Sequence, residues 1–429
     1  MKVAIVGAGW AGCAAAVEAT RRGHHVTLFE ATRTPGGRAR CVGVDLNGNV
    51  LALDNGQHIL IGAYSETLAL MAQLGVDVKA SLLRMPLTLQ SPDGSGLALP
   101  QWPAPLDALA GILRARGWSW ADKLSLLKVA IGWQITGFTC EPRQSVAGVC
   151  RQLSPQIMAS FIEPLCVSAL NISAAQASGQ VFLRVLRDAM FSGTGGSNLL
   201  LPRVDLSALL PAAAIACLQE KGGAVRLGAR VQSISRTGQR WAVGTGTSEE
   251  FDAVVLACPP LEAARLVQSC GLASEPWLSQ ALALQYTAIT TVYAIASGAR
   301  LRQPMLALPS TAGLPAQFVF DRGQLGGPAG LLAFVISASE GDAAELGRQV
   351  VLQAKVQLGL ADLQVLKTIV EKRATFACTP GLQRPGLRVT SANMLSLLAC
   401  GDYIDGPYPA TLEGAVRSGL DAAHTLSVV

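Results

Sequence analysis

The sequence is poor in charged residues. Only 15% of its 429 residues are charged, whereas about 25% is usual for a soluble protein. The formal net charge is a modest +5, and no dense run of lysine or arginine occurs. We therefore expect no nucleic-acid partner. Half of the residues are apolar, which indicates a large core or a site for an apolar ligand.

Metal-binding spacings and long apolar runs are also missing. Ten cysteines are scattered without a C-x-x-C pair or a Cys/His cluster, so we expect no metal site. Reduced thiols of this kind are typical of a cytoplasmic protein. No run of about 18 apolar residues occurs, so no membrane-spanning helix is expected. Glycines close to the N-terminus also argue against a signal peptide there.

The strongest motif lies in the first forty residues. An apolar strand at 2–6 is followed by Gly-Ala-Gly-Trp-Ala-Gly at 7–12, a helix at 13–22 and a strand at 26–29. This order is typical of a dinucleotide-binding fold, whose glycines form the turn, admit the pyrophosphate and let the helix pack closely. Backbone N–H groups at the helix start bind the phosphates. The residues expected at this site are Gly7, Gly9, Trp10, Ala11 and Gly12.

Glu30 ends the second predicted strand. Dinucleotide-binding folds place an acid here, where it accepts hydrogen bonds from the ribose hydroxyls and disfavours the 2′-phosphate of NADP. The alternative is a glycine-rich turn in an ordinary α/β fold. That alternative does not account for strand, glycines, helix, strand and acid in one register.

The pattern changes at Pro100, and residues 106–187 are predicted to be mostly helical. Four of the seven tryptophans fall in or just before this segment, among basic residues. Tryptophan with basic residues on amphipathic helices is typical of a membrane interface. A helical lid packed on its own core explains the same pattern, so both interpretations stay open.

The rest of the chain alternates strands and helices. We expect helices at 206–221 and 343–358, and strands at 224–227, 230–235, 253–257, 289–296, 317–320, 331–337 and 365–375. A short strand at 397–400 is followed by Gly401-Asp402 and a last helix at 411–426. A carboxylate after such a strand can bind a polyol, and the start of a helix favours negative charge on a flavin.

Together, these features resemble the flavin amine oxidase superfamily. The resemblance implies FAD and an α/β fold: a Rossmann-like FAD-binding domain assembled from discontinuous segments, an inserted mixed-sheet substrate domain and a helical subdomain. It also implies that a second glycine pair with its arginine covers the pyrophosphate, that a mid-chain valine meets the adenine, and that an aspartate holds the ribitol or pyrophosphate. The residues that match these roles or lie near the flavin are Gly36, Gly37, Arg38, Gly56, Gln57, His58, Val231, Gly401, Asp402, Thr411 and Leu412.

Four further segments carry a closer resemblance. Residues 54–58, 163–171, 180–186 and 409–419 are similar to the squalene-associated FAD-dependent desaturases, now described as hydroxysqualene dehydroxylases of hopanoid biosynthesis. The resemblance implies an enzyme that removes the allylic hydroxyl of hydroxysqualene to give squalene. Reduced FAD would donate hydride to an allylic cation while water leaves, and an acid would protonate the hydroxyl.

The proton donor is not fixed by the resemblance. His58 follows a polar turn that the superfamily places near the flavin, and its ordinary pKa of about 6.5 suits proton transfer. Asp54 either orients His58 or only caps the turn. Asp405 and Tyr408 lie in the turn before the last helix and are the other catalytic candidates, and the Tyr408 ring can alternatively stack against a cation.

The predicted FAD-binding domain comprises residues 1–80, 195–265 and 385–429. The substrate domain comprises 81–100 and 266–384, and the helical subdomain comprises 101–194. Expected partners are the apolar C30 isoprenoid substrate, the inner face of a membrane contacted peripherally, and the upstream enzyme that forms hydroxysqualene. The sequence fixes neither the oligomeric state nor the electron source, and Cys400 gives no positive signal for covalent flavin attachment.

Other functions remain open from the sequence alone. One is a different flavoenzyme of the superfamily, either a carotenoid-type desaturase or an amine oxidase. An amine oxidase would need an aromatic cage, and aromatic residues make up only 5% of this chain. The other is a non-catalytic, flavin-bearing scaffold that delivers lipid between membrane enzymes.

Overall fold

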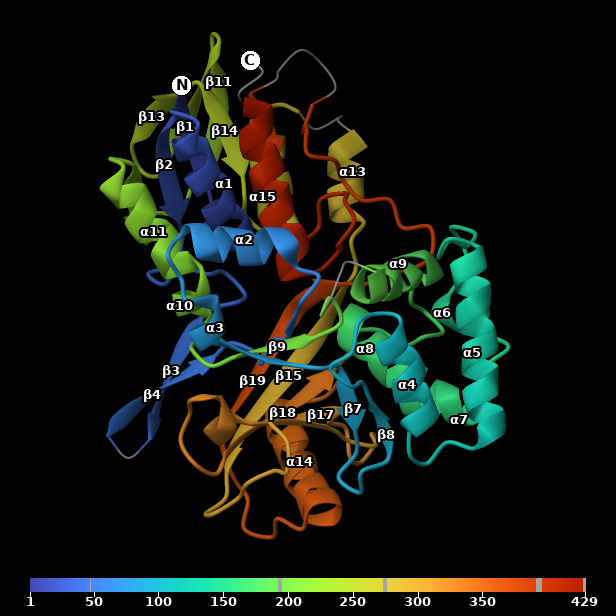
Figure 1. Cartoon of the computed structure of the whole chain (residues 1–429). Helices are drawn as coiled ribbons and strands as arrows, with labels where there is room; N and C mark the ends of the chain where they lie inside the picture. Colours follow the sequence, from blue (N-terminus) through green and yellow to red (C-terminus); the bar gives the residue numbers. More distant parts are fainter. Residues whose placement is uncertain (47, 192–194, 273–275, 391–395, 427–429) are drawn as a thin grey trace.

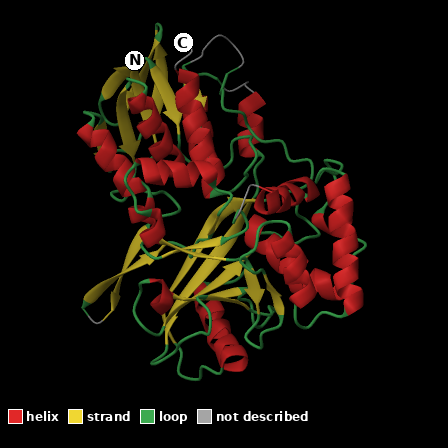
Figure 2. Cartoon of the chain, in the orientation of Figure 1, coloured by secondary structure: helices red, strands yellow, loops and turns green. Residues whose placement is uncertain are grey.

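Figure 1 shows a computed structural model of the chain, which describes residues 1–429 except 47, 192–194, 273–275, 391–395 and 427–429. The molecule has three parts. The first contains the N-terminal strand and the last helix, the second is built on a long sheet below it, and the third is a group of helices at one side. Figure 2 shows that helices dominate the third part, while strands gather in the other two.

The first part is organised around a parallel five-stranded sheet of order β10-β2-β1-β14-β20. Most residues of its inner strands are apolar and buried, as expected for parallel strands that are covered on both faces. Residues from three distant regions of the chain thereby share one sheet. The strands are β1 (Lys2–Val6), β2 (His25–Glu30), β10 (Ala224–Leu227), β14 (Ala253–Leu256) and β20 (Leu397–Ala399).

Two long helices pack against each other over this sheet (Figure 1). They are α1 (Trp10–Arg21), which begins three residues earlier than predicted, and α15 (Leu412–Leu426). A Cβ at Gly419 of α15 would lie 2.2 Å from the Ala11 carbonyl oxygen, so glycine permits this close crossing. α2 (Ser65–Gln73) packs against α15.

The helix predicted at 206–221 is interrupted. It forms α10 (Leu206–Leu209) and α11 (Pro211–Glu220), separated by Leu210 with non-helical backbone angles. Proline has no N–H, and it disfavours helical geometry in the residue before it. Pro211 therefore starts a new helix instead of continuing the old one.

A three-stranded antiparallel sheet extends this part of the molecule. The strand predicted at 230–235 begins only at Ser233, so Val231 lies in the irregular segment before it. The strands are β11 (Ser233–Thr237), β12 (Arg240–Gly244) and β13 (Ser248–Phe251), and helices α12 (Pro260–Ser269) and α13 (Pro276–Leu282) follow in the chain.

The second part contains a five-stranded sheet of order β16-β17-β18-β15-β19. All its described pairs are antiparallel, where we expected a mixed sheet; the short links from β16 to β17 and β17 to β18 allow only antiparallel neighbours. Helix α14 (Ala343–Leu358) covers one face. The strands are β15 (Tyr286–Ile295), β16 (Met305–Ala307), β17 (Phe318–Asp321), β18 (Leu331–Ser337) and β19 (Gln364–Phe376), with the short helix η2 (Arg322–Leu325).

Short strands connect the parts. β5 (Leu60–Ile61), β9 (Leu199–Pro202) and β6 (Leu82–Met85) form one small sheet, preceded by the unpredicted helix α3 (Val78–Ser81). Two hairpins complete the strands: β3 (Cys41–Leu46) with β4 (Asn49–Asp54), and β7 (Thr88–Gln90) with β8 (Gly96–Ala98).

The third part is helical, as predicted. Its elements are α4 (Leu106–Arg114), α5 (Trp120–Ile135), α6 (Val146–Val149), α7 (Pro155–Ile157), the π-helix η1 (Met158–Ile162), α8 (Glu163–Leu170) and α9 (Gly179–Phe191). Within the residues that the structure describes, no helix is long and apolar enough to cross a membrane.

Candidate cofactor and catalytic site

The glycines at the start of α1 leave open space in front of the helix. Gly7 has a φ of +114°, which suits glycine, and its N–H donates to the Phe29 carbonyl. A Cβ at Gly12 would lie 1.9 Å from the Gly7 carbonyl oxygen, so helix and strand meet at van der Waals contact. A Cβ at Gly9 would meet no atom within 4 Å. The chain thus packs tightly behind the loop and is open in front of it.

The open side of the loop presents the N-terminus of α1. Its N-cap, Gly9, has no capping side chain, and the first turn contains no acidic residue. Trp10 and Ala11 start the helix, and Trp10 Nε1 donates to the Ala39 carbonyl at 3.1 Å. Uncapped N–H groups and the positive end of the helix dipole suit a bound pyrophosphate.

Glu30 lies at the end of β2, beside the same loop. Its Oε2 accepts the Ala8 N–H at 2.8 Å, while its Oε1 accepts the N–H and hydroxyl of Thr32 at 2.8 and 2.9 Å. These bonds hold the carboxylate in place. An ionised carboxylate has about four acceptor positions, so Glu30 keeps one for a ribose hydroxyl.

Gly36, Gly37 and Arg38 cross over the first glycine loop. The Gly36 N–H donates to the Ala8 carbonyl at 2.8 Å, and a Cβ at Gly37 would lie 3.3 Å from the Gly9 Cα. Arg38 then reaches the other end of the chain and forms an ion pair with Asp402 at 2.5 Å. The Asp402 carboxylate raises the pKa of Arg38, in opposition to burial, which acts to lower it.

The C-terminal motif follows β20. The Gly401 N–H donates to the Ser418 hydroxyl of α15, and the Ala410 N–H donates to the Asp402 carbonyl. Thr411 precedes the first helical residue, Leu412, and its Oγ1 accepts the Gly414 N–H at 3.0 Å. The loop from β20 to α15 is therefore held at both ends, with Asp402 pointing to Arg38.

Val231 follows β10, the strand that pairs with β2 beside Glu30. The N–H of Ala229, two residues before Val231, donates to the Glu30 carbonyl at 2.8 Å. Val231 is buried, and its carbonyl accepts from Arg265 at 3.1 Å. Within the described part of the chain its N–H has no hydrogen-bond partner. This N–H is the group expected to bind adenine.

Gly56, Gln57 and His58 lie where β15 approaches the first part of the molecule. The Gln57 N–H donates to the Thr291 hydroxyl at 3.4 Å, and Gln57 Oε1 accepts from the buried Arg322 at 3.3 Å. The His58 Nδ1 lies 2.7 Å from the Gly56 carbonyl. A carbonyl only accepts, so Nδ1 carries the proton and Nε2 is left for a ligand.

Burial lowers the pKa of His58 below its ordinary value, and the positive charge of Arg38 lowers it further. The Gly56 carbonyl acts in the opposite direction. Asp54 does not orient His58: it is buried, and its Oδ1 accepts the Leu206 N–H at 2.8 Å. Burial raises the pKa of Asp54 to about 6.

The two other acid candidates differ in exposure. Asp405 is 72% exposed and pairs with Arg384 at 3.1 Å. Tyr408 is half-buried, and the guanidinium of Arg417 lies 5.1 Å from its ring centroid. Burial is the main cause that raises the pKa of Tyr408 to about 12.

Sequence reasoning missed two tyrosines beside the Arg38–Asp402 pair. The hydroxyls of Tyr286 and Tyr403 are buried and have no partner among the described residues. Burial is the main cause that raises the pKa of Tyr286 to about 12, and the Asp402 charge contributes to the rise. Buried hydroxyls without partners are costly unless a ligand or water binds them. No sequence motif marks these residues; only their position next to Asp402 does.

The residues present fit FAD. The uncapped helix start, the open space at Gly9, the fixed Glu30 carboxylate and the unpartnered hydroxyls next to Asp402 are complementary to a pyrophosphate, a ribose and a polyol. The class of protein follows from a family comparison. Residues 10–427 match the model of the flavin containing amine oxidoreductases. The chain belongs to this family and is an FAD-dependent oxidoreductase.

Comparisons with individual proteins are more specific about the activity than the family match is. The chain is 29% identical to the hydroxysqualene dehydroxylase of Rhodopseudomonas palustris, over 98% of this chain and 97% of that protein. It is 26% identical to the enzyme of that name from Sinorhizobium fredii, with the same coverage. A putative protoporphyrinogen oxidase from Exiguobacterium has a similar fold, with a TM-score of 0.70 at 16% identity over 100% of this chain and 98% of that one. These findings confirm the predicted family resemblance and fold class.

Proposed function

We propose that the protein removes the hydroxyl group of hydroxysqualene reductively and yields squalene. The observation that carries this proposal is the similarity, over nearly the full length of both chains, to enzymes named hydroxysqualene dehydroxylase. In the overall reaction, the C–O bond of the substrate breaks, one hydride forms the new C–H bond, and one proton joins the departing hydroxyl to give water.

FAD bound in reduced form supplies the hydride. The chain's own residues would hold the cofactor. The start of α1, with the Gly36-Gly37-Arg38 turn above it, would bind the pyrophosphate, and Glu30 would bind the ribose. Val231 would meet the adenine, and Asp402 would hold the ribitol or pyrophosphate. The positive end of the last helix, which starts at Leu412, would favour negative charge on the flavin.

We further propose His58 as the donor of the proton. Its Nδ1–H is held by the Gly56 carbonyl, so Nε2 presents the second proton when the ring is charged. Hydroxide is a poor leaving group, and a positioned acid typically contributes about 10²–10⁴ in rate. Asp405 remains a weaker candidate because it is exposed and paired with Arg384. Tyr408 is also a weaker candidate, because burial raises the pKa of its phenol to about 12 and so makes it a weaker acid.

The test uses the purified, FAD-loaded protein under anaerobic conditions. After photoreduction, addition of hydroxysqualene should reoxidise the flavin, followed by absorbance at about 450 nm, and mass spectrometry should identify squalene. Reduction of the oxidised flavin by an amine would instead favour an amine oxidase. Formation of new double bonds in a polyprenyl substrate would favour a desaturase. A protein that turns over no polyprenyl alcohol would be a lipid-delivery scaffold, and the proposal would fail.

A further inference from the structure

The outer surface of the helical part is unusually apolar. Of the fifteen large apolar side chains that the structure leaves exposed in its described residues, eight lie on α4, α5 and the turn before them. We call this surface the α4–α5 face. It consists of Trp102, Leu106, Leu109, Leu113, Trp120, Leu124, Ile131 and Ile135.

The exposed residues form two straight stripes. At about 100° per residue, those of α4 (Leu106, Leu109 and Leu113) fall within about 60° of the helix circumference. Those of α5, from Trp120 to Ile135, also fall within about 60°. The opposite side of α5 carries Leu126, Val129 and Trp133, which are buried in the core. α5 is thus apolar on both sides, and its core contacts account for only one of them.

Basic residues lie along the apolar stripes. The Arg114 guanidinium stands 5.0 Å from the Trp102 ring, and Lys123 Nζ stands 5.0 Å from the Trp120 ring. Lys123 Nζ also donates to the Leu113 carbonyl at 2.9 Å, which joins the end of α4 to the start of α5. Tryptophan and basic side chains at the edge of an apolar surface are typical of the bilayer interface.

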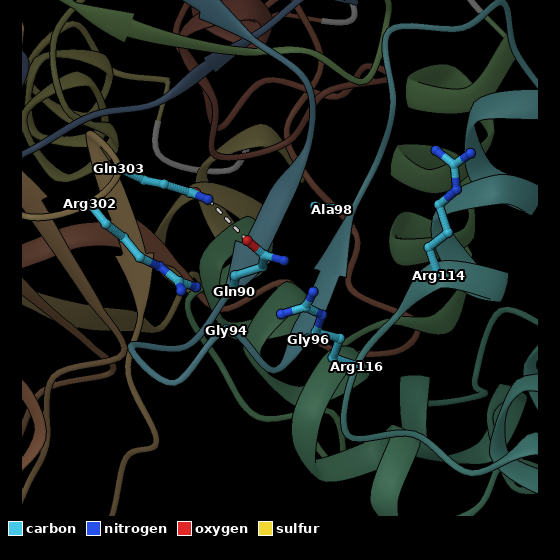
Figure 3. Close-up of a pocket in the computed structure, with 8 residues that line it drawn as sticks. All are labelled: Gln90, Gly94, Gly96, Ala98, Arg114, Arg116, Arg302 and Gln303. Atoms are coloured by element: carbon cyan, nitrogen blue, oxygen red, sulfur yellow. Dashed lines mark hydrogen bonds between the residues drawn. The ribbon is translucent and has the colours of Figure 1, made fainter.

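A pocket of about 450 Å³ opens beside the end of α4 (Figure 3). Arg114, Arg116 and Arg302 line it from α4, from the segment after α4 and from the loop before β16. Within the described residues none of the three has an ion pair within 4 Å. Asp93 is the nearby carboxylate, and it accepts the N–H and hydroxyl of Ser95. The pocket therefore has an excess of positive charge and suits a phosphate group.

We propose that the α4–α5 face docks onto an anionic phospholipid bilayer, with the arginine pocket binding a lipid phosphate. Charge decides between this occupant and a second copy of the chain. A two-fold interface would place the α4–α5 face of one copy against the same face of the other. The arginines and lysines of the two copies would then lie close together and repel each other. An anionic membrane attracts them instead, by an amount that grows with each basic residue.

The docking proposal goes beyond the proposed dehydroxylation. It also places the enzyme beside its substrate, because an apolar C30 substrate resides in the bilayer.

The experiment uses the FAD-loaded full chain and sedimentation with vesicles of phosphatidylglycerol or of phosphatidylcholine. We expect binding to the anionic vesicles, weakened by salt. The variant I131S/I135S and the variant R114E/R116E should each bind at least tenfold more weakly, with unchanged thermal unfolding.

Matched controls come from elsewhere on the surface. L352S/V356S removes two exposed apolar residues at the same helical spacing on α14, and K221E/K355E reverses two exposed charges. Both should bind vesicles like the wild type. Turnover of detergent-dispersed hydroxysqualene should be unaffected by I131S/I135S, which separates docking from chemistry.

Three results would overturn the docking proposal. The wild type fails to sediment with anionic vesicles, or the α14 control weakens binding as much as I131S/I135S does. In the third, the wild type is a dimer that I131S/I135S converts to a monomer without vesicle binding, which would make this face an interface between copies.

Discussion

At the scale of single residues, two glycines of one motif have different tasks. A Cβ at Gly9 would enter open space, whereas a Cβ at Gly12 would lie 1.9 Å from the Gly7 carbonyl oxygen. We expect Gly9→Ala to weaken FAD binding at least tenfold without changing unfolding of the FAD-free protein. Gly12→Ala should destabilise the FAD-free protein by about 1–3 kcal/mol, the usual cost of overpacking.

Titration with FAD and thermal unfolding measure both effects of the glycine substitutions. If G9A binds FAD as tightly as the wild type, the cofactor does not occupy the space in front of Gly9. If G12A unfolds like the wild type, the tight contact between α1 and β1 is not required.

His58 gives a prediction on pH. Burial and Arg38 lower its pKa, so the charged form that donates a proton is present below a pKa that is itself below about 6.5. The rate of flavin reoxidation by hydroxysqualene should fall as the pH rises through that value. His58→Asn should abolish this limb of the pH profile and lower the rate by about 10²–10⁴.

The matched control for the pH prediction is His25→Asn, which changes an exposed histidine. It should leave the profile unchanged in single-turnover measurements. A wild-type limb that persists in H58N would assign the proton to another group. Asp405→Asn would be the next variant to measure, because Tyr408, whose pKa is raised to about 12, does not titrate in this range.

At the scale of secondary-structure elements, one buried carboxylate joins two helices. Glu413, in the first turn of α15, is fully buried and accepts the N–H groups of Glu66 and Thr67 at the start of α2. It also accepts from Arg417 at 2.7 Å. Glu413→Gln replaces an acceptor by an amide donor that faces these N–H groups, and removes the charge.

We expect Glu413→Gln to lower the free energy of unfolding by about 1–3 kcal/mol, because buried N–H donors at the start of α2 would face an amide instead of a carboxylate. The partly exposed Arg417 also loses an ion pair. Urea unfolding measures the loss. Glu345→Gln is the control: it removes an ion pair with Arg348 in which both side chains are exposed, and should cost about 0.5 kcal/mol or less. Equal effects in the two variants would show that burial does not strengthen the Glu413 contacts.

Element boundaries were predictable where periodicity and glycine marked them. The helix at 343–358 and most strands were expected within a few residues of their observed bounds. Pro211 is a sequence signal for the break, but the helical periodicity on both sides of it favoured one continuous helix. The short helix α3 was not predicted, because four residues carry too little periodicity.

At the scale of the whole molecule, Arg38 and Asp402 join the two ends of the chain. Their ion pair connects residues separated by 364 positions. Asp402→Asn should weaken FAD binding at least tenfold, about 1.4 kcal/mol, and reduce the increase in melting temperature that FAD causes.

Asp405→Asn is the matched control for Asp402→Asn, because Asp405 is three residues away, exposed and paired with a different arginine. It should retain the wild-type affinity for FAD. If D402N binds FAD normally, Asp402 has only a structural role. If D405N abolishes turnover without loss of FAD, Asp405 is the proton donor after all.

Asn171 ends the segment 163–171, which the sequence marked only by its resemblance to a family. The structure gives this residue a role in packing. It ends α8 with a left-handed backbone conformation and donates to the hydroxyls of Thr287 and Thr375 on the long sheet. Its Oδ1 accepts the Ala338 N–H. These contacts join the helical part to the sheet, so Asn171 fixes the relative position of two parts of the molecule.

The sequence by itself determined the class of fold and predicted where the ADP half of the cofactor binds, because the turn at Gly7, the start of α1 and the acid at Glu30 are local features with fixed spacing. Only the tertiary structure decided what surrounds them. The Arg38–Asp402 pair, the unpartnered hydroxyls of Tyr286 and Tyr403, and the outward apolar side of α5 depend on contacts between residues far apart in the chain. Such contacts leave no periodicity in the sequence, since each residue's neighbours come from a different element.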